Sequence, residues 1–177
     1  PERIAALAEI AVEDDLITSP HFLTYAQVGF RNFTNSARVI KTPADLKGLK
    51  FRVMENPVYM NLVRSMGAAP TPIPWPETYT ALQQKVVDGQ ENPISAIKFA
   101  KLYEVQKYMT MDGHTFGVSF MLINEKFFQG LPKEYQAILK QAALTSAVSE
   151  NGIDNLDSAI GVQFLKDKGM EVYAPTA

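Results

Sequence analysis

The stretch between Lys41 and Pro93 limits the possible folds most, because short helical and extended patterns alternate there, bounded by proline or glycine. Thr42 and Pro43 have the residue types of a helix start, and Gly48 ends that helix. Residues 49–54 then alternate as a strand before Asn56-Pro57 opens the next helix. Such alternation of strand and helix predicts the α/β class with a mostly parallel sheet.

The remaining segments continue the same pattern. Four prolines at alternate positions, Pro70, Pro72, Pro74 and Pro76, suit an edge strand or a crossover. A polar turn is expected at 32–36, and Asp88-Gly89 ends a helix before Asn92-Pro93 opens another. The other expected strands are 23–30, 108–111, 116–123 and 170–174. The other expected helices are 3–13, 92–102 and the longest one, which Pro132 opens and Gly169 follows.

Composition excludes several classes of function. The net charge is −2 without a long run of either sign, so no basic stripe is available for nucleic acid. No apolar run reaches 18 residues, so we expect no membrane insertion. The chain has no cysteine, which excludes disulfides and thiolate metal sites. It begins without Met, and we expect a fragment truncated at both ends.

Enzymatic motifs are missing from the chain. It contains only two histidines, His21 and His114, and no nucleophile elbow, zinc motif or phosphate-binding glycine loop. His114 follows Asp112-Gly113 near a strand end, where a hydrogen-bonded structural role is favoured over a role in a pocket. His21 follows Pro20 and is expected in a solvated loop.

Arg52 lies in an otherwise apolar strand and allows two interpretations. If Phe51 and Val53 face the core, Arg52 faces outward and is a surface residue. Alternatively, its planar guanidinium binds a carboxylate through two parallel hydrogen bonds. The pattern alone leaves both open.

Two further positions carry similar alternatives. Trp75, the only tryptophan, is either a core aromatic or a ring held against a ligand by Pro74 and Pro76. The polar run 88–93 is either a plain turn with a helix cap or a site in which the amide of Asn92 binds a ligand.

Residues 42–53, TPADLKGLKFRV, and residues 87–93, VDGQENP, resemble the solute-binding proteins of tripartite ATP-independent periplasmic (TRAP) transporters, of the DctP type. The resemblance covers roughly residues 29–177. It implies a two-lobed fold of the periplasmic-binding-protein type with a ligand cleft between the lobes and a long helix spanning both. Residues 1–28 would end the first lobe, and 29–117 would form the second. Residues 118–157 would return to the first lobe, and 158–177 to the second.

The resemblance also implies roles for individual residues. Arg52 matches the arginine that pairs with the ligand carboxylate, and Asn92 matches the asparagine that supports the same group. Further ligand-binding positions are expected at Arg31, Trp75 and Phe116. Glu55 departs from the ligand-binding Asn of some members, which leaves the far end of the ligand open.

The function implied by the resemblance is capture of a small organic carboxylate in the periplasm and its delivery to TRAP membrane permease subunits, with no cofactor and no chemistry on the ligand. C4-dicarboxylates, sugar acids and keto acids are all candidate ligands. A sensory input module with the same pocket is an alternative. An enzyme on a related scaffold is a second alternative, with His114, Glu77 and Glu91 as its only candidate acids or bases.

Overall fold

The computed structural model describes residues 20–175, so the helix expected at 3–13 lies outside the described residues. The chain divides into two compact units. One comprises Gly117–Asp154 with the described residues up to Val28, and the other comprises Gly29–Phe116 with the described residues from Asn155 onward. The long elements β1, β5 and α6 contribute residues to both units.

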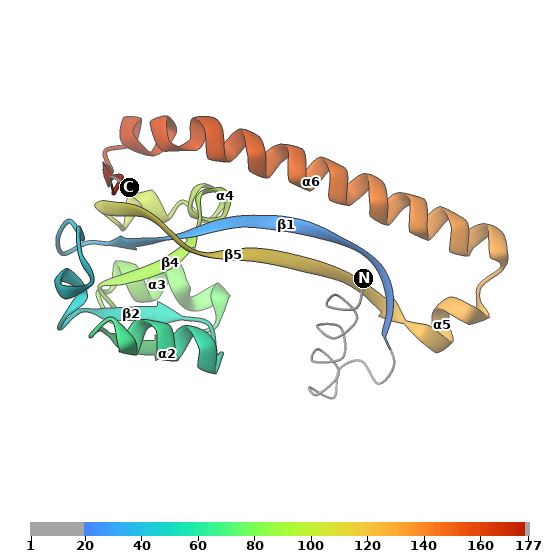
Figure 1. The fold of residues 1–177 in the computed structure, drawn as a ribbon, viewed down its shortest axis with the longest axis horizontal. Coiled ribbons are helices and arrows are strands. Elements are labelled where there is room, and N and C mark those ends of the chain that lie inside the picture. The colour runs from blue at the N-terminus through green and yellow to red at the C-terminus, as the bar shows by residue number, and fades with distance from the viewer. Residues whose placement is uncertain (1–19, 176–177) are drawn as a thin grey trace. The chain divides into compact units, whose positions relative to one another are not determined.

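Strands and helices alternate along most of the described chain (Figure 1). The strands are β1 (Pro20–Asn35), β2 (Lys50–Val53), β3 (Ala69–Pro72), β4 (Gly89–Pro93), β5 (Tyr108–Asn124) and β6 (Glu171–Tyr173). The α-helices are α2 (Pro57–Ser65), α3 (Thr78–Gln83), α4 (Ile94–Phe99), α5 (Glu125–Gly130) and α6 (Lys133–Asp167). Short 3-10 turns are η1 (Pro43–Leu46), η2 (Trp75–Glu77) and η3 (Leu102–Glu104).

The strands form one mixed sheet in the order β3-β2-β4-β1-β5-β6. Strand β2 is parallel to both β3 and β4, β5 is parallel to β6, and β1 is antiparallel to β4. The expected α/β class is thus confirmed. Strand β3 carries two of the alternating prolines and lies at the sheet edge. An edge strand tolerates proline because the missing N–H can fall on the side that has no neighbouring strand.

The expectation of a turn at 88–93 is wrong, because Gly89–Pro93 forms β4, a strand between β2 and β1. The helix expected at 92–102 follows directly and is shorter, α4 (Ile94–Phe99) with Pro93 as its N-cap. All five residues of β4 are buried. A polar strand tolerates this burial because its side chains find partners on neighbouring strands. Gly89 is required there: a Cβ would lie 2.5 Å from Cε1 of Phe51 and would also meet the carbonyl oxygen of Thr34.

The expected turn at 32–36 is wrong for a similar reason, since β1 continues through Asn35. The Oδ1 of Asn32 accepts a hydrogen bond from the amide of Gly113, and the hydroxyl of Thr34 donates to Gln106. Tertiary partners therefore replace the local turn bonds that these residue types favour. The two strands expected at 108–111 and 116–123 are one continuous strand, β5.

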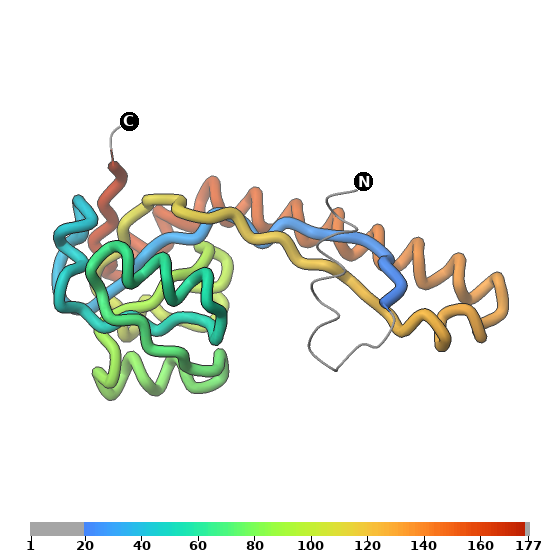
Figure 2. The backbone as a smooth tube through the Cα atoms, turned by 60° about the horizontal axis from the view of Figure 1, so that its bottom comes forward, coloured from blue at the N-terminus to red at the C-terminus, as the bar shows by residue number. Residues whose placement is uncertain are grey.

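Two apolar clusters pack in the unit built on Gly29–Phe116, where the backbone trace turns back on itself repeatedly (Figure 2). In one cluster, Phe51 and Val53 of β2 pack with Val63 of α2. In the other, α3, α4 and the end of α6 meet around Leu82, Ile97 and Leu165. Helix α2 thus belongs to one cluster, and α3 and α4 to the other.

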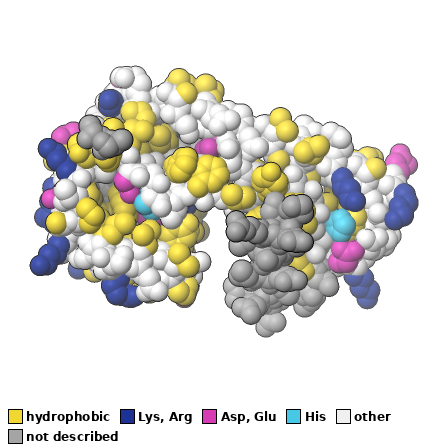
Figure 3. Space-filling model, viewed as in Figure 1, with side chains coloured by type: hydrophobic (Ala, Val, Ile, Leu, Met, Phe, Trp, Pro, Cys, Tyr) yellow, Lys and Arg dark blue, Asp and Glu magenta, His cyan; other side chains and the backbone are white. Residues whose placement is uncertain are grey.

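The other unit contains the start of α6, which confirms the long helix expected after Pro132. His21 is wrongly expected in a solvated loop: it lies in β1, hydrogen-bonded to Glu125 at 2.7 Å and stacked on Phe128. Apolar side chains remain exposed along α6 (Figure 3), among them Ile138, Val148 and Ile153. Within residues 20–175, no helix is long and apolar enough to cross a membrane.

Candidate functional site

The carboxyl ends of β2 and β4 mark the point where the sheet changes direction. From β2 the chain crosses to β3 on one side, and it then returns past β2 to β4 on the other side. In open α/β sheets ligands bind at the carboxyl ends of the strands that flank such a switch point. Arg52 is the next-to-last residue of β2, and Asn92 is the next-to-last residue of β4.

The strand register places these two side chains on the same face. Arg52 is paired with Gln90 in the parallel ladder of β2 and β4. Asn92 lies two residues beyond Gln90, and side chains two positions apart point to the same face of a strand. The fold thus brings Arg52 and Asn92 together at the switch point.

Arg52 is buried, with 3% of its surface exposed, so its interpretation as a surface residue is wrong. Its Nε donates to the carbonyl of Ile73 at 2.8 Å, and its guanidinium carbon lies 5.5 Å from the centre of the Trp75 ring. Within the described chain, Nη1 and Nη2 make no hydrogen bond or ion pair. Burial lowers the pKa of Arg52, and the charge of Arg31 lowers it further, against the opposing effect of Glu91.

Arg31, in contrast, is paired with a carboxylate of the chain itself. Its Nε contacts Oε2 of Glu91, and its Nη2 donates to Oε1 at 2.9 Å and to the Glu91 carbonyl at 2.7 Å. The guanidinium also lies over the ring of Tyr59, 5.1 Å from its centre. The positive charge of Arg31 is therefore neutralised, while that of Arg52 has no carboxylate partner among the described residues.

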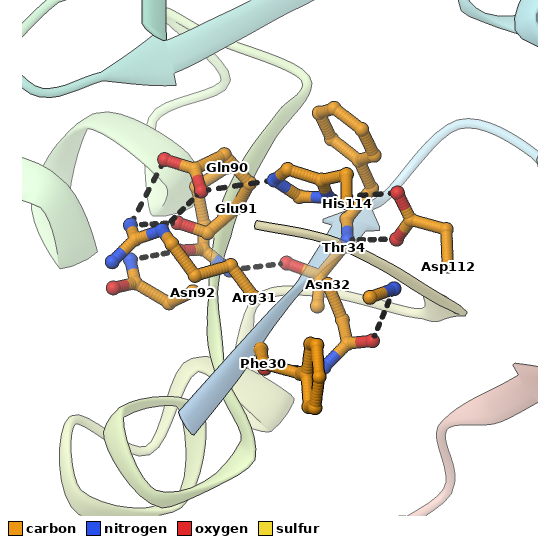
Figure 4. A network of polar contacts seen from close by, with 11 residues as sticks. Phe30, Arg31, Asn32, Thr34, Gln90, Glu91, Asn92, Asp112 and His114 are labelled. Atoms are coloured by element: carbon orange, nitrogen blue, oxygen red, sulfur yellow. Dashed lines mark hydrogen bonds and ion pairs between the residues drawn. The ribbon is translucent and has the colours of Figure 1, made fainter. Parts of the chain in front are cut away.

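His114 completes the network around Glu91 (Figure 4). Its imidazole lies 2.7 Å from Oδ2 of Asp112 and 3.2 Å from Oε2 of Glu91, and it stacks on Phe33. Burial alone would lower the pKa of His114, but the hydrogen bonds and charges of Asp112 and Glu91 raise it to about 9. Burial raises the pKa of Glu91, whereas His114 and Arg31 lower it, and the net shift is downward.

The amide of Asn92 belongs to a different set of contacts. Its Nδ2 donates to Oε1 of Gln90, whose Nε2 donates to the hydroxyl of Thr34 at 2.8 Å. The Thr34 hydroxyl donates to Oε1 of Gln106 at 3.0 Å. The sequence pattern gave no indication of these partners, because β4 was not recognisable as a strand.

The other predicted site residues are more exposed. Trp75 begins η2 and has 39% of its surface exposed beside Arg52. Phe116 is 47% exposed in β5, and its ring meets that of Phe30 edge to face at 4.9 Å. Glu55 is exposed just after β2. No cluster of side chains that could hold a metal ion occurs among residues 20–175.

Comparison with known proteins gives a consistent result. Residues 17–177 match the family described as bacterial extracellular solute-binding protein, family 7. A 2,3-diketo-L-gulonate-binding periplasmic protein of Escherichia coli is 36% identical over 150 residues, which cover 85% of this chain and 46% of that protein. The chain thus spans less than half the length of this curated relative.

Solved structures agree with the fold. A TRAP periplasmic solute-binding protein of Bordetella, with density assigned to pantoate, has a TM-score of 0.85 and 40% identity, covering 94% of this chain and 55% of that one. A second, from Polaromonas and bound to D-erythronate, has a TM-score of 0.85 and 34% identity, covering 99% of this chain and 60% of that one.

Proposed function

This chain belongs to the bacterial extracellular solute-binding proteins of family 7, and on that premise we propose that it is part of the periplasmic component of a TRAP transporter that captures a small organic carboxylate. The observation that carries the proposal is the unpaired fork of Arg52, a buried arginine at the switch point of the sheet. The ligands named for these relatives, 2,3-diketo-L-gulonate, pantoate and D-erythronate, are all organic acids, which supports the same class of ligand here.

Arg52 acts as the anchor for the carboxylate. The Nε of Arg52 is hydrogen-bonded to the Ile73 carbonyl, and its guanidinium lies over the Trp75 ring. Both contacts limit rotation of the guanidinium, so that Nη1 and Nη2 are already positioned for a ligand. A charged hydrogen bond contributes about 1.5–3 kcal/mol. Two such bonds with additional packing approach the roughly −8 kcal/mol of micromolar binding.

The other predicted residues support this anchor. Asn92, on the adjacent strand, donates to the same carboxylate, and Trp75 packs against the carbon skeleton of the ligand. Phe116 offers a further exposed ring. Arg31 makes a weaker case for direct contact, because Glu91 already neutralises it, and we assign it a role in the electrostatics of the site.

The whole protein closes two lobes over the ligand and passes it to a membrane permease. The two units of this chain correspond in this proposal to parts of the first and second lobes. Binding is reversible and the ligand leaves unchanged, so the protein is not an enzyme. Only a state in which both lobes touch the ligand gains the full set of contacts, which favours closure on binding.

A thermal-shift screen of the full-length protein against small organic acids tests the proposal, with the amide of each acid as its matched control. A ligand present at 100 times its Kd stabilises the folded state by about 2.7 kcal/mol. We expect at least one acid to raise the Tm while its amide leaves it unchanged. A screen in which no acid raises the Tm, or in which amides act equally well, would contradict the assignment.

A further inference from the structure

A chain of buried hydrogen bonds leads away from Asn92 into the interior of the unit. It runs from the Asn92 amide to Gln90, from Gln90 to the Thr34 hydroxyl, and from that hydroxyl to Gln106. All four residues are buried, and Thr34 and Gln90 have no exposed surface. Figure 4 shows the part of this chain that lies between Asn92 and Thr34.

Backbone carbonyls at the far end fix the direction of every bond. The Nε2 of Gln106 donates to the carbonyls of Val105, at 3.0 Å, and Asp88, at 3.3 Å. Because a carbonyl only accepts hydrogen bonds, Oε1 of Gln106 must face Thr34. The Thr34 hydroxyl then donates to Gln106, and its oxygen accepts from Gln90.

The same logic reaches Asn92. With its Nε2 committed to Thr34, Gln90 presents Oε1 to Asn92, so the Nδ2 of Asn92 must lie on that side. A flipped Asn92 amide would place two acceptors against each other. An isolated asparagine amide can adopt either of two orientations. The orientation of the Asn92 amide is instead set by the two carbonyls that bind Gln106, at the other end of the hydrogen-bonded chain.

We propose that Gln90, Thr34 and Gln106 are positioning residues that orient Asn92 for the ligand, an inference that rests on the function proposed above. Within the described chain, the second N–H and the Oδ1 of Asn92 make no hydrogen bond. The ligand carboxylate therefore meets a donor that is already oriented, and binding does not have to fix the amide. Preorganisation of this kind raises affinity by lowering the cost of ordering on binding.

A purely structural role makes a different prediction. If the four side chains only satisfy one another in the interior, breaking the chain lowers stability but leaves the state of the Asn92 amide unchanged. If they position Asn92, a substitution at Thr34 or Gln106 frees the Asn92 amide to adopt either orientation, even though neither residue contacts Asn92.

The matched variants are Thr34→Val, which removes the hydroxyl at nearly constant shape, and Thr34→Ser, which keeps it. Gln106→Met removes the amide that links Thr34 to the backbone carbonyls. It replaces Thr34→Val in the experiment if that variant does not fold. The readout is hydrogen exchange of the two Asn92 amide protons by NMR, in ligand-free full-length protein labelled with 15N-asparagine. The signal is assigned by its loss in Asn92→Asp.

In the wild type and Thr34→Ser, we expect one Asn92 amide proton to exchange about tenfold more slowly than the other, the effect of one hydrogen bond. In Thr34→Val and Gln106→Met, both protons should exchange at the same fast rate. A folded Thr34→Val or Gln106→Met protein that keeps the wild-type asymmetry would overturn the proposal. Because the measurement needs no ligand, its failure is distinct from a failure of acid binding.

Discussion

Arg31 and Glu91 form an ion pair in the interior of the sheet, with both side chains at or below 7% exposure and contacts from Nε and Nη2 to the two carboxylate oxygens. The pair joins β1 to β4, and Glu91 directly precedes Asn92 in β4. The two arginines thus differ in their surroundings: Arg31 is neutralised by Glu91, whereas the guanidinium of Arg52 has no carboxylate partner among the described residues.

Removing one partner of this pair should be costly. In Glu91→Gln the guanidinium of Arg31 and the imidazolium of His114 lose their common counter-charge. Breaking a buried pair in this way costs about 3–5 kcal/mol. Urea unfolding at pH 7 measures the loss.

The control is Asp157→Asn, which breaks the more exposed pair with Lys98. Because water reaches this pair more readily than the pair of Arg31 and Glu91, we expect its loss to cost less, toward the value of about 1 kcal/mol typical of exposed pairs. If Glu91→Gln and Asp157→Asn lower the free energy of unfolding by the same amount, the ion pair of Arg31 and Glu91 has no special role in stability.

His114 should make stability depend on pH. Its pKa rises from 6.5 to about 9 on folding, so its stabilisation is complete below pH 6.5 and disappears as the pH rises through 9. We expect the free energy of unfolding to fall by about 2–3 kcal/mol between pH 6.5 and pH 9.5. Urea titrations across this range check the decline, and His114→Gln should flatten it. An equal decline in that variant would assign the effect to other groups.

Gly89→Ala should destabilise the protein because the added methyl group meets the Phe51 ring and the Thr34 carbonyl. Overpacking against backbone costs about 1–3 kcal/mol or more. Gly152→Ala in α6 is the matched control, since no described residue outside the helix backbone lies within 4 Å of an added Cβ and alanine favours a helix by about 0.8–1 kcal/mol. Opposite shifts in Tm are expected. A neutral Gly89→Ala would show that β2 and β1 can move apart at β4.

The sequence predicted the elements whose signals are local. Proline and glycine positions indicated η1, the edge strand β3 and the start of α6, because these residues restrict or release the backbone wherever they occur. The resemblance carried by residues 42–53 and 87–93 identified the family that the comparison then confirmed.

The polar strands were not predictable in this way. Asn32 and Thr34 have residue types that favour turns, and Gln90 and Glu91 lack the apolar alternation of a strand, so their place in β1 and β4 depends on partners distant in sequence. The site was therefore predicted only in part. Arg52 and Asn92 were predicted as ligand-binding residues, whereas the hydrogen bonds that join Asn92 to Gln90 and Gln90 to Thr34 became visible only when the strands were paired.

The most direct test of the account is calorimetric titration of full-length Arg52→Met with the acid that most stabilises the wild type. The control is Arg38→Met, which removes an exposed arginine that donates to the carbonyls of Asp45 and Lys47. Loss of two charged hydrogen bonds predicts a fall in affinity of more than about 100-fold for Arg52→Met, with Arg38→Met close to the wild type. An Arg52→Met protein that binds the acid as tightly as the wild type would contradict the role of Arg52 as the carboxylate anchor.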